Sequence, residues 1–265
     1  STPRPSPALL ARPRQSWSTH LGPKTLPIRA LARNERIELL QKLAKHLTDK
    51  EAGDIAGALA DLPLALHLAG SFLHKYRNDV SAQVYLDQLQ SDYILEHAAL
   101  KGRGTEQLPT KHDVCVAKTF AMSYDQLDQQ DAIDAIGVSL LALSACFAPG
   151  IPIPRALLLK TIRDDENEID PLDISDGLSR LVELGLIETQ QEEDLVLHRL
   201  LCAFVQQMPC MDAKAQRNVE TTLRDEAYRI NNSGLPAGLQ AWQAHLRFVT
   251  DRAIVNEDKM TANLC

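Results

Sequence analysis

The sequence has no long apolar run and no signal for secretion. No stretch approaches the roughly 20 consecutive apolar residues that span a bilayer, and we expect no membrane partner. Residues 1–7 are rich in proline and lack both a starting methionine and the apolar core of a signal peptide. The absence of these features favours a fragment or a processed start over a secreted precursor, and predicts a cytoplasmic location.

Cysteine pairs with the spacing of zinc or redox motifs are also missing. The five cysteines are Cys115, Cys146, Cys202, Cys210 and Cys265. An odd number without a C-x-x-C pair is typical of thiols in a reducing compartment. His67 and His74 lie seven residues apart on one expected helix, but no third ligand has suitable spacing, so we expect no bound metal.

An excess of positive charge is absent as well. The net charge is −7 and the isoelectric point about 5.6. An acidic chain has no overall electrostatic attraction to nucleic acid. We therefore expect no nucleic-acid partner.

The motifs of nucleotide hydrolysis are missing too. No G-x-x-x-x-G-K-[ST] loop occurs, and the nearest segment, GPKT at residues 22–25, places a proline where backbone N–H groups must hold phosphate. No apolar strand pattern ends in acidic residues that could hold Mg²⁺, and no serine lies in G-x-S-x-G. We predict that the chain is not an enzyme by itself.

What the sequence does contain is helical periodicity along most of its length. With 265 residues, 45% of them hydrophobic, it is long enough for more than one small core. We expect an irregular segment at 1–26 and a helical bundle at 27–104 with helices near 35–47, 51–60 and 80–89, and a helix that begins with LPLAL at 62–66 and carries His67 and His74. Asn34 is expected to cap the first of these helices.

A different order of elements is predicted for residues 114–208. Helices at 114–127, 130–147 and 155–162 precede a helix that Asp173 or Ser175 can cap and that ends at Leu184. Two strand patterns then follow, at 186–190 and 194–197, around a polar turn. Successive helices followed by a hairpin are the order of elements in a winged helix. Its expected recognition helix carries one arginine against two acids, so we predict an internal interaction surface rather than a DNA reader.

The C-terminal part, residues 212–265, is predicted to form a helical hairpin. Its helices are expected at 212–230 and 237–253, and residues 260–265 resemble the first helix of a further repeat. The predicted fold class is therefore mainly α: a helical bundle, a winged-helix subdomain with a small β-hairpin, and a C-terminal helical hairpin.

One motif, LPLAL at residues 62–66, places Pro63 in the opening turn of an apolar helix. Proline is tolerated there because its missing N–H needs no partner. Asp61, just before the motif, can cap that helix and interact favourably with its dipole. Taken alone, the motif is consistent with an ordinary capped core helix.

Four landmarks in order give the motif more meaning. They are LPIRAL at 26–31 with the helix after it, LPLAL at 62–66, FAMSYDQL at 120–127 and LVLHRLL at 195–201. Together they cover roughly residues 12–208, which resemble the C-terminal half of the NB-ARC module of STAND-type signalling NTPases. The tail resembles the start of an array of tetratricopeptide (TPR) repeats.

This resemblance implies an ADP-sensing role that depends on a P-loop core outside the sequence. Pro63, with Leu62 and Leu64, would line the adenine side of ADP, and His198 would contact the β-phosphate. An imidazole can donate to a phosphate oxygen, and that charge favours its protonation. Arg12 and Arg14 are the candidates for a sensor arginine.

The resemblance also implies partners. They are a P-loop nucleotide-binding core, an effector domain, and proteins bound through the C-terminal helices. ADP or ATP would bind only when the P-loop core is present.

The sequence departs from the family pattern at three places. Asp61 replaces the usual glycine, Leu197 and Arg199 flank His198 where plant members have Met and Asp, and Pro13 occupies the position of the sensor arginine. A capping or packing role for His198 stays open. So does a helical protein-interaction module, or a winged-helix transcription regulator, that binds no nucleotide.

Overall fold

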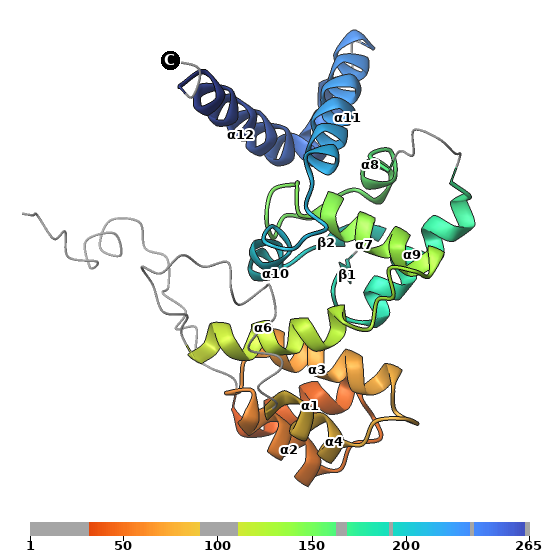
Figure 1. Ribbon diagram of the computed structural model, residues 1–265, viewed down its shortest axis with the longest axis vertical. Coiled ribbons are helices and arrows are strands. Elements are labelled where there is room, and N and C mark those ends of the chain that lie inside the picture. Colours follow the sequence, from red (N-terminus) through yellow and green to blue (C-terminus); the bar gives the residue numbers. More distant parts are fainter. Residues whose placement is uncertain (1–31, 91–110, 163–168, 191–192, 234–235, 263–265) are drawn as a thin grey trace, which may run out of the picture.

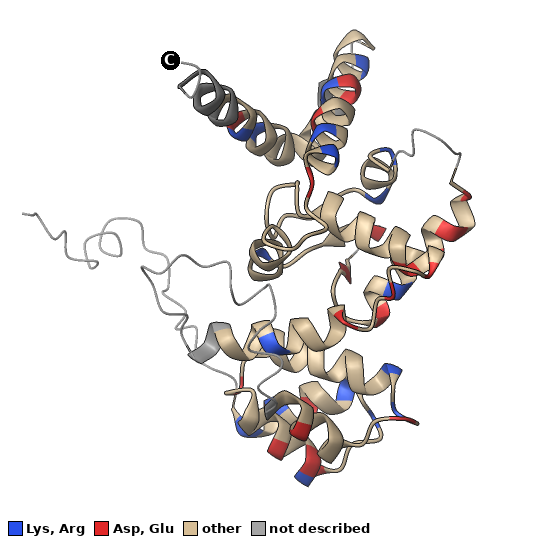
Figure 2. Cartoon of the chain, viewed as in Figure 1, with Lys and Arg blue, Asp and Glu red and all other residues tan. Residues whose placement is uncertain are grey.

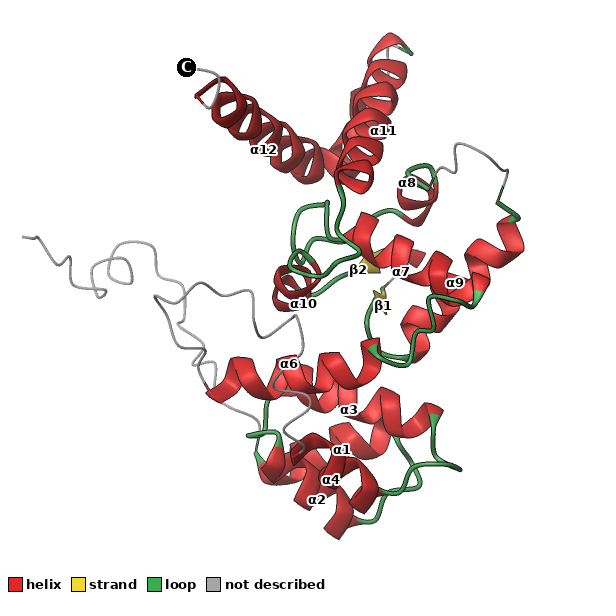
Figure 3. Ribbon diagram, in the orientation of Figure 1, coloured by secondary structure: helices red, strands yellow, loops and turns green. Residues whose placement is uncertain are grey.

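The structure is a computed structural model, and it describes residues 32–90, 111–162, 169–190, 193–233 and 236–262. These residues are mainly helical with one two-stranded antiparallel sheet (Figure 3), which confirms the predicted fold class. The elements in chain order are α1 (Arg33–Leu43), α2 (Asp49–Ala58), α3 (Pro63–Lys75), α4 (Ala82–Gln90), α6 (Lys111–Tyr124), α7 (Ala132–Ser144), α8 (Arg155–Leu159), α9 (Pro171–Glu183), β1 (Glu188–Thr189), β2 (Leu195–Val196), α10 (Arg199–Val205), α11 (Ala213–Asn232), the 3-10 helix η3 (Pro236–Trp242) and α12 (Gln243–Ala262).

The N-terminal bundle is built around α3, which packs against α1 and α6 (Figure 1). Of the nine residues of α3 from Ala65 to Leu73, eight are buried and only His67 is half-buried. Such a helix must be apolar on most of its surface, as the sequence of α3 is. The N-terminus of α2 is fixed by a capping box, in which the Thr48 hydroxyl and the Glu51 carboxylate each accept from the other residue's backbone N–H.

The expected cap of α1 is wrong. Asn34 is the second residue inside the helix, and Ala32 is the N-cap. The Glu35 carboxylate accepts from the backbone N–H of Ala32. An acidic side chain in the first turn can satisfy that donor, so the helix begins one residue before the predicted cap.

The second group of elements has the predicted winged-helix order. Between α7 and α8, Ile153 forms an isolated antiparallel bridge to Leu195, so that a short extended segment lies beside the hairpin. The hairpin itself pairs Glu188 with Val196 and Thr189 with Leu195. We call α7 to α10 the winged-helix unit.

The predicted cap of α9 is also wrong. Pro171 occupies the first helical position, and Asp170 is the N-cap, its carboxylate accepting from the N–H of Leu172 at 2.8 Å. Asp173 and Ser175 therefore lie inside the helix. Because proline is favoured at the first position of a helix, Pro171 moves the start upstream of the predicted site.

The C-terminal helices α11 and α12 diverge from the corner formed by η3 (Figure 1). We call η3 and α12 the C-terminal arm. The helix expected at 212–230 ends later than predicted, because Asn231 and Asn232 belong to the last turn of α11. The expected new helix at Met260 is wrong, since α12 continues without a break through Ala262.

Buried apolar side chains form one connected core from the bundle through the winged-helix unit to Val219, Trp242 and Val249. None of the four described cysteines forms a disulfide: Cys146 and Cys202 are buried, and Cys115 and Cys210 are half-buried. Within the described ranges, no helix combines the length and the apolar character needed to cross a bilayer.

Candidate functional site

Pro63 opens α3 as predicted, but Asp61 does not cap this helix. Ala60 and Asp61 both have left-handed backbone, with φ of 52° and 61°. These two residues reverse the chain between α2 and α3, and the Asp61 carboxylate pairs with Arg36 of α1 instead of the helix N-terminus. Leu62 is the N-cap and offers no side-chain hydrogen bond.

The two leucines beside Pro63 belong partly to the core. Leu62 and Leu64 are half-buried and pack against the buried cluster, whereas Pro63 is exposed. The motif therefore presents one accessible proline ring between two apolar side chains that are held in place.

His198 is the N-cap of α10. Its Nδ1 accepts a hydrogen bond from the backbone N–H of Leu200 at 3.2 Å. Partial burial lowers the pKa of His198, and the neighbouring Arg199 lowers it further, while Glu188 opposes both. The capping role left open by the sequence is thus the role that His198 has here, as a neutral ring with its proton on Nε2.

The hairpin that leads to His198 packs directly on the LPLAL helix. Gly185, at the turn between α9 and β1, has φ of +71°, and a Cβ at this position would lie 2.8 Å from the Oγ of Ser71. Only glycine permits both the left-handed backbone and this close approach. One turn of α3 before Ser71, the Nε2 of His67 lies 4.0 Å from Oε1 of Glu188.

The hairpin brings Glu188 close to His198. Glu188 of β1 pairs with Val196 of β2, two residues before His198, and its carboxylate acts to raise the pKa of the His198 ring. On α3, Pro63 and His67 are four residues apart and share a helix face. The structure thus forms a junction in which His67, one turn after Pro63 on α3, faces Glu188 of the hairpin, whose second strand leads to His198. We call it the α3–hairpin junction.

Sequence reasoning missed Glu188 and gave His67 no role. The only signal for Glu188 was its place in the alternating strand pattern after Ile187. Nothing local in the sequence says that an acid on this strand faces a histidine more than 100 residues earlier.

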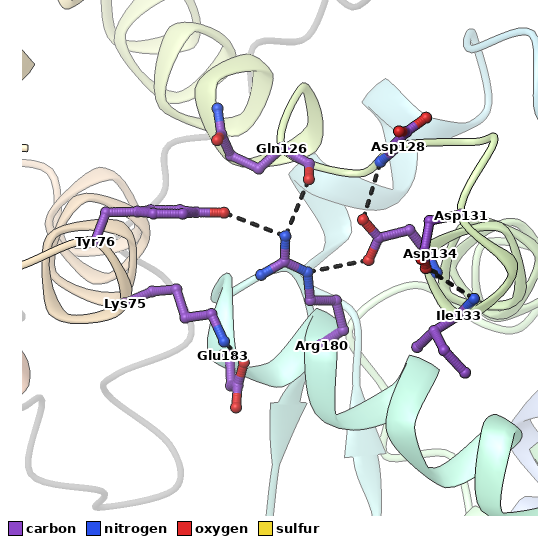
Figure 4. Close-up of polar contacts among 9 residues, drawn as sticks. All are labelled: Lys75, Tyr76, Gln126, Asp128, Asp131, Ile133, Asp134, Arg180 and Glu183. Atoms are coloured by element: carbon purple, nitrogen blue, oxygen red, sulfur yellow. Dashed lines mark hydrogen bonds and ion pairs between the residues drawn. The ribbon is translucent and has the colours of Figure 1, made fainter. Parts of the chain in front are cut away.

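A second polar contact joins the same two parts of the molecule (Figure 4). The guanidinium of Arg180 donates to Oδ1 of Asp134 at 3.0 Å, to the carbonyl of Gln126 at 3.1 Å and to the hydroxyl of Tyr76 at 3.2 Å. Beside them, Lys75 forms an ion pair with Glu183. We call Arg180 and its three partners the Arg180 clasp.

The clasp keeps its arginine charged. Burial alone would lower the pKa of Arg180, but the bonds to Tyr76 and Asp134 outweigh it and hold the pKa above its ordinary value. The second oxygen of Asp134 accepts from the N–H of Asp128 at 3.0 Å. The clasp thus fixes α9 against both α7 and the end of α3.

The cavity formed by α7 and α11 lies away from the α3–hairpin junction. It has a volume of about 320 Å³, and neither Pro63 nor His198 lines it. In the part of the chain that the structure describes, no three His, Cys, Asp or Glu side chains are grouped to hold a metal ion. The sensor candidates Arg12 and Arg14 lie outside the described residues.

Neither the models of known protein families nor the curated proteins contain a match to this chain.

Proposed function

We propose that this chain is the regulatory, ADP-sensing part of a STAND-type (NB-ARC) signal-transduction NTPase. It would lack the P-loop, hydrolyse nothing alone, and bind ADP or ATP only beside a P-loop core. The observation that supports this proposal most directly is the packing of the LPLAL helix against the hairpin that leads to His198.

The tautomer of His198 suits a phosphate contact. Its Nδ1 is occupied by the cap of α10, so Nε2 carries the proton and can donate to a phosphate oxygen. Pro63 is exposed and flanked by fixed leucines, which suits contact with a flat adenine ring. Because His198 caps α10 and its ring also interacts with the carboxylate of Glu188, a ligand on Nε2 would act on both elements.

Calorimetric titration with ADP tests the proposal. The chain is titrated alone, and again after mixing with a separately produced P-loop core of a STAND-type protein. We expect heat of binding to the mixture beyond that to the core alone, and a loss of at least about tenfold in affinity for His198→Ala, the size of one charge-assisted hydrogen bond.

His74→Ala is the matched control, because His74 lies on α3 but is exposed in its last turn. It should leave the affinity unchanged. If the mixture binds ADP no better than the core alone, and His198→Ala changes nothing, the proposal is wrong.

The alternative is a helical protein-interaction module or a winged-helix transcription regulator that binds no nucleotide. The surface of α9 argues against the DNA-binding form, because it carries Asp173, Asp176 and Glu183 (Figure 2). Arg180, the single basic residue of α9, is engaged in the clasp. Duplex DNA in the same calorimeter should therefore give no heat.

A further inference from the structure

His245, on α12, is the most deeply buried histidine among the described residues, with no exposed surface. Its Nδ1 accepts from the backbone N–H of Ala148 at 3.1 Å, and its Nε2 lies 2.8 Å from the carbonyl oxygen of Pro152. The edge of the ring meets Phe147 at a centroid distance of 5.3 Å and an angle of 87°. Both nitrogens are therefore bonded to one short segment, 148–152, of the winged-helix unit.

This pair of bonds fixes the tautomer. A nitrogen that accepts from an N–H carries no proton, so the proton must be on Nε2, which donates to Pro152. A second proton on Nδ1 would face the Ala148 N–H, break that bond and place a positive charge in the core. The docked arm is thus compatible only with neutral His245.

Both hydrogen-bond partners of His245 are backbone groups, and the segment that supplies them, 145–154, contains no charged residue. Asp194, before β2, is the charged group that acts on the ring, and its carboxylate favours protonation. Of the other packed elements, α10 places Arg199 beside Gly150, and Glu220 of α11 and Arg252 of α12 act on the neighbouring Cys146. Burial lowers the pKa of His245, although the bond to Pro152 and the carboxylate of Asp194 act in the opposite direction.

The other described contacts of the arm with the core are apolar, and Leu239, Leu246 and Phe248 contribute to them. The buried residues at the start of the arm are Trp242, His245 and Val249, spaced as one stripe of a helix. His245 lies in the middle of that stripe and provides hydrogen bonds from it to segment 148–152. By contrast, α11 is tied to the end of α8 by the Thr222 hydroxyl and by Lys160 with Glu226.

We propose that His245 is a proton-sensitive anchor: as a neutral ring it docks the C-terminal arm on the winged-helix unit, and its protonation releases the arm while the rest of the chain stays folded. The direction follows from linkage. The undocked arm binds the proton at an ordinary histidine pKa of about 6.5, so docking is complete above that pH and weakens about tenfold per pH unit below it, down to the lowered pKa of the docked state.

The chain contains its own reporter. It has two tryptophans, Trp17 and Trp242, and Trp242 is only 6% exposed at the foot of the arm. In a Trp17→Phe variant, the emission of Trp242 and its quenching by acrylamide are followed from about pH 8 to about pH 5. We expect a reversible red shift and increased quenching in acid, with loss of only part of the helical circular-dichroism signal.

His245→Gln in the same background is the decisive variant. A glutamine amide offers one acceptor and one donor, as the neutral ring does, but does not titrate. The acid transition should disappear in this variant and persist in His74→Gln, which changes an exposed histidine. A transition that is unchanged in His245→Gln would overturn the proposal.

A second measurement covers the case in which His245→Gln is already undocked at about pH 8. The imidazole resonances of the unmodified chain are then titrated by NMR. A His245 resonance that titrates below the other histidines, together with the shift of Trp242, supports the proposal. A His245 that titrates at an ordinary histidine pKa without any change at Trp242 contradicts it.

Discussion

Two contacts join the three parts of this molecule, and they differ in charge: we call them the first joint, between the bundle and the winged-helix unit, and the second joint, between the winged-helix unit and the C-terminal arm. Between the bundle and the winged-helix unit, Lys75 of α3 pairs with Glu183 of α9, and Arg180 of α9 donates to the hydroxyl of Tyr76. The charge of Arg180 is balanced within the winged-helix unit by Asp134 of α7, and these two side chains are 21% and 11% exposed. Between the winged-helix unit and the C-terminal arm, a fully buried neutral imidazole bonds to backbone groups. An arginine and an aspartate stay charged throughout the neutral range, whereas an imidazole does not. The charges at the first joint therefore do not change over the neutral pH range, whereas protonation of His245 can change the second joint.

The largest expected effect comes from breaking the charged joint. Arg180→Met leaves the carboxylate of Asp134 largely buried without its guanidinium. Removing one partner of a buried pair costs about 3–5 kcal/mol, mostly the cost of the charge left behind. Urea denaturation should show this loss in the free energy of unfolding.

Two controls separate burial from charge. Arg224→Met removes an exposed arginine that pairs with Asp225, and should cost at most about 1 kcal/mol. Adding Asp134→Leu to Arg180→Met should recover part of the stability, because no charge is left unpaired. Equal costs for Arg180→Met and Arg224→Met would mean that the clasp does not hold the first joint.

The next largest loss of stability is expected when a glycine at each joint is replaced by alanine. Gly185 and Gly150 have φ of 71° and 73°. Alanine at either position carries the cost of left-handed backbone, about 1–2 kcal/mol. At Gly185 the new Cβ would also meet Ser71 at 2.8 Å, whereas at Gly150 its nearest neighbour is 3.8 Å away. Thermal or urea denaturation should therefore rank Gly185→Ala as clearly more destabilising than Gly150→Ala, and equal losses would show that α3 is not tightly packed against this turn.

Much of this architecture follows from the sequence, and the exceptions have a common cause. Helices, hairpin and the position of Pro63 were predicted because spacing, proline and strand alternation are local signals. The predicted cap at Asp61 is wrong, since the left-handed backbone of Ala60 and Asp61 turns the carboxylate toward Arg36. A turn of this kind is set by how α2 and α3 pack, not by the residue types in it.

The contacts of Arg180 and His245 were also missed, because they depend on the packing of distant elements. Arg180 was visible as the one arginine on a predicted recognition helix, but its partners Asp134 and Tyr76 lie 46 and 104 residues away. The bonds of His245 span more than 90 residues. Contacts that depend on how distant elements pack carry no local pattern, so sequence reasoning cannot supply them.

A smaller loss in the free energy of unfolding is expected at His198, whose imidazole, like that of His245, accepts a hydrogen bond from a backbone N–H. His198→Ala removes the cap of α10 and should cost about 1 kcal/mol at about pH 8. Its pKa is lowered in the folded chain, so the contribution of the cap is complete above about pH 6.5 and is lost as the pH falls below that value.

His198→Asn is the matched control for that titration. Asparagine is a good N-cap and does not titrate. It should keep the stability at about pH 8 and lose less of it than the unmodified chain at about pH 5, measured by urea denaturation at both values. A pH dependence that is the same in both chains would remove His198 from the groups that titrate on unfolding.

The smallest expected effect concerns the ion pair between the end of α8 and α11, the helix that precedes the C-terminal arm. Lys160 pairs with Glu226 of α11 at 2.8 Å, but the lysine side chain is 49% exposed. Lys160→Met leaves Arg229 paired with Glu226 and keeps the Lys160 backbone carbonyl that accepts from Thr222. The loss in the free energy of unfolding should therefore be at most about 0.5–1 kcal/mol, and smaller still at high salt. A cost as large as that of Arg180→Met would mean that an exposed ion pair stabilises this chain as much as the buried pair of Arg180 does, and the special weight given to the Arg180 clasp would be wrong.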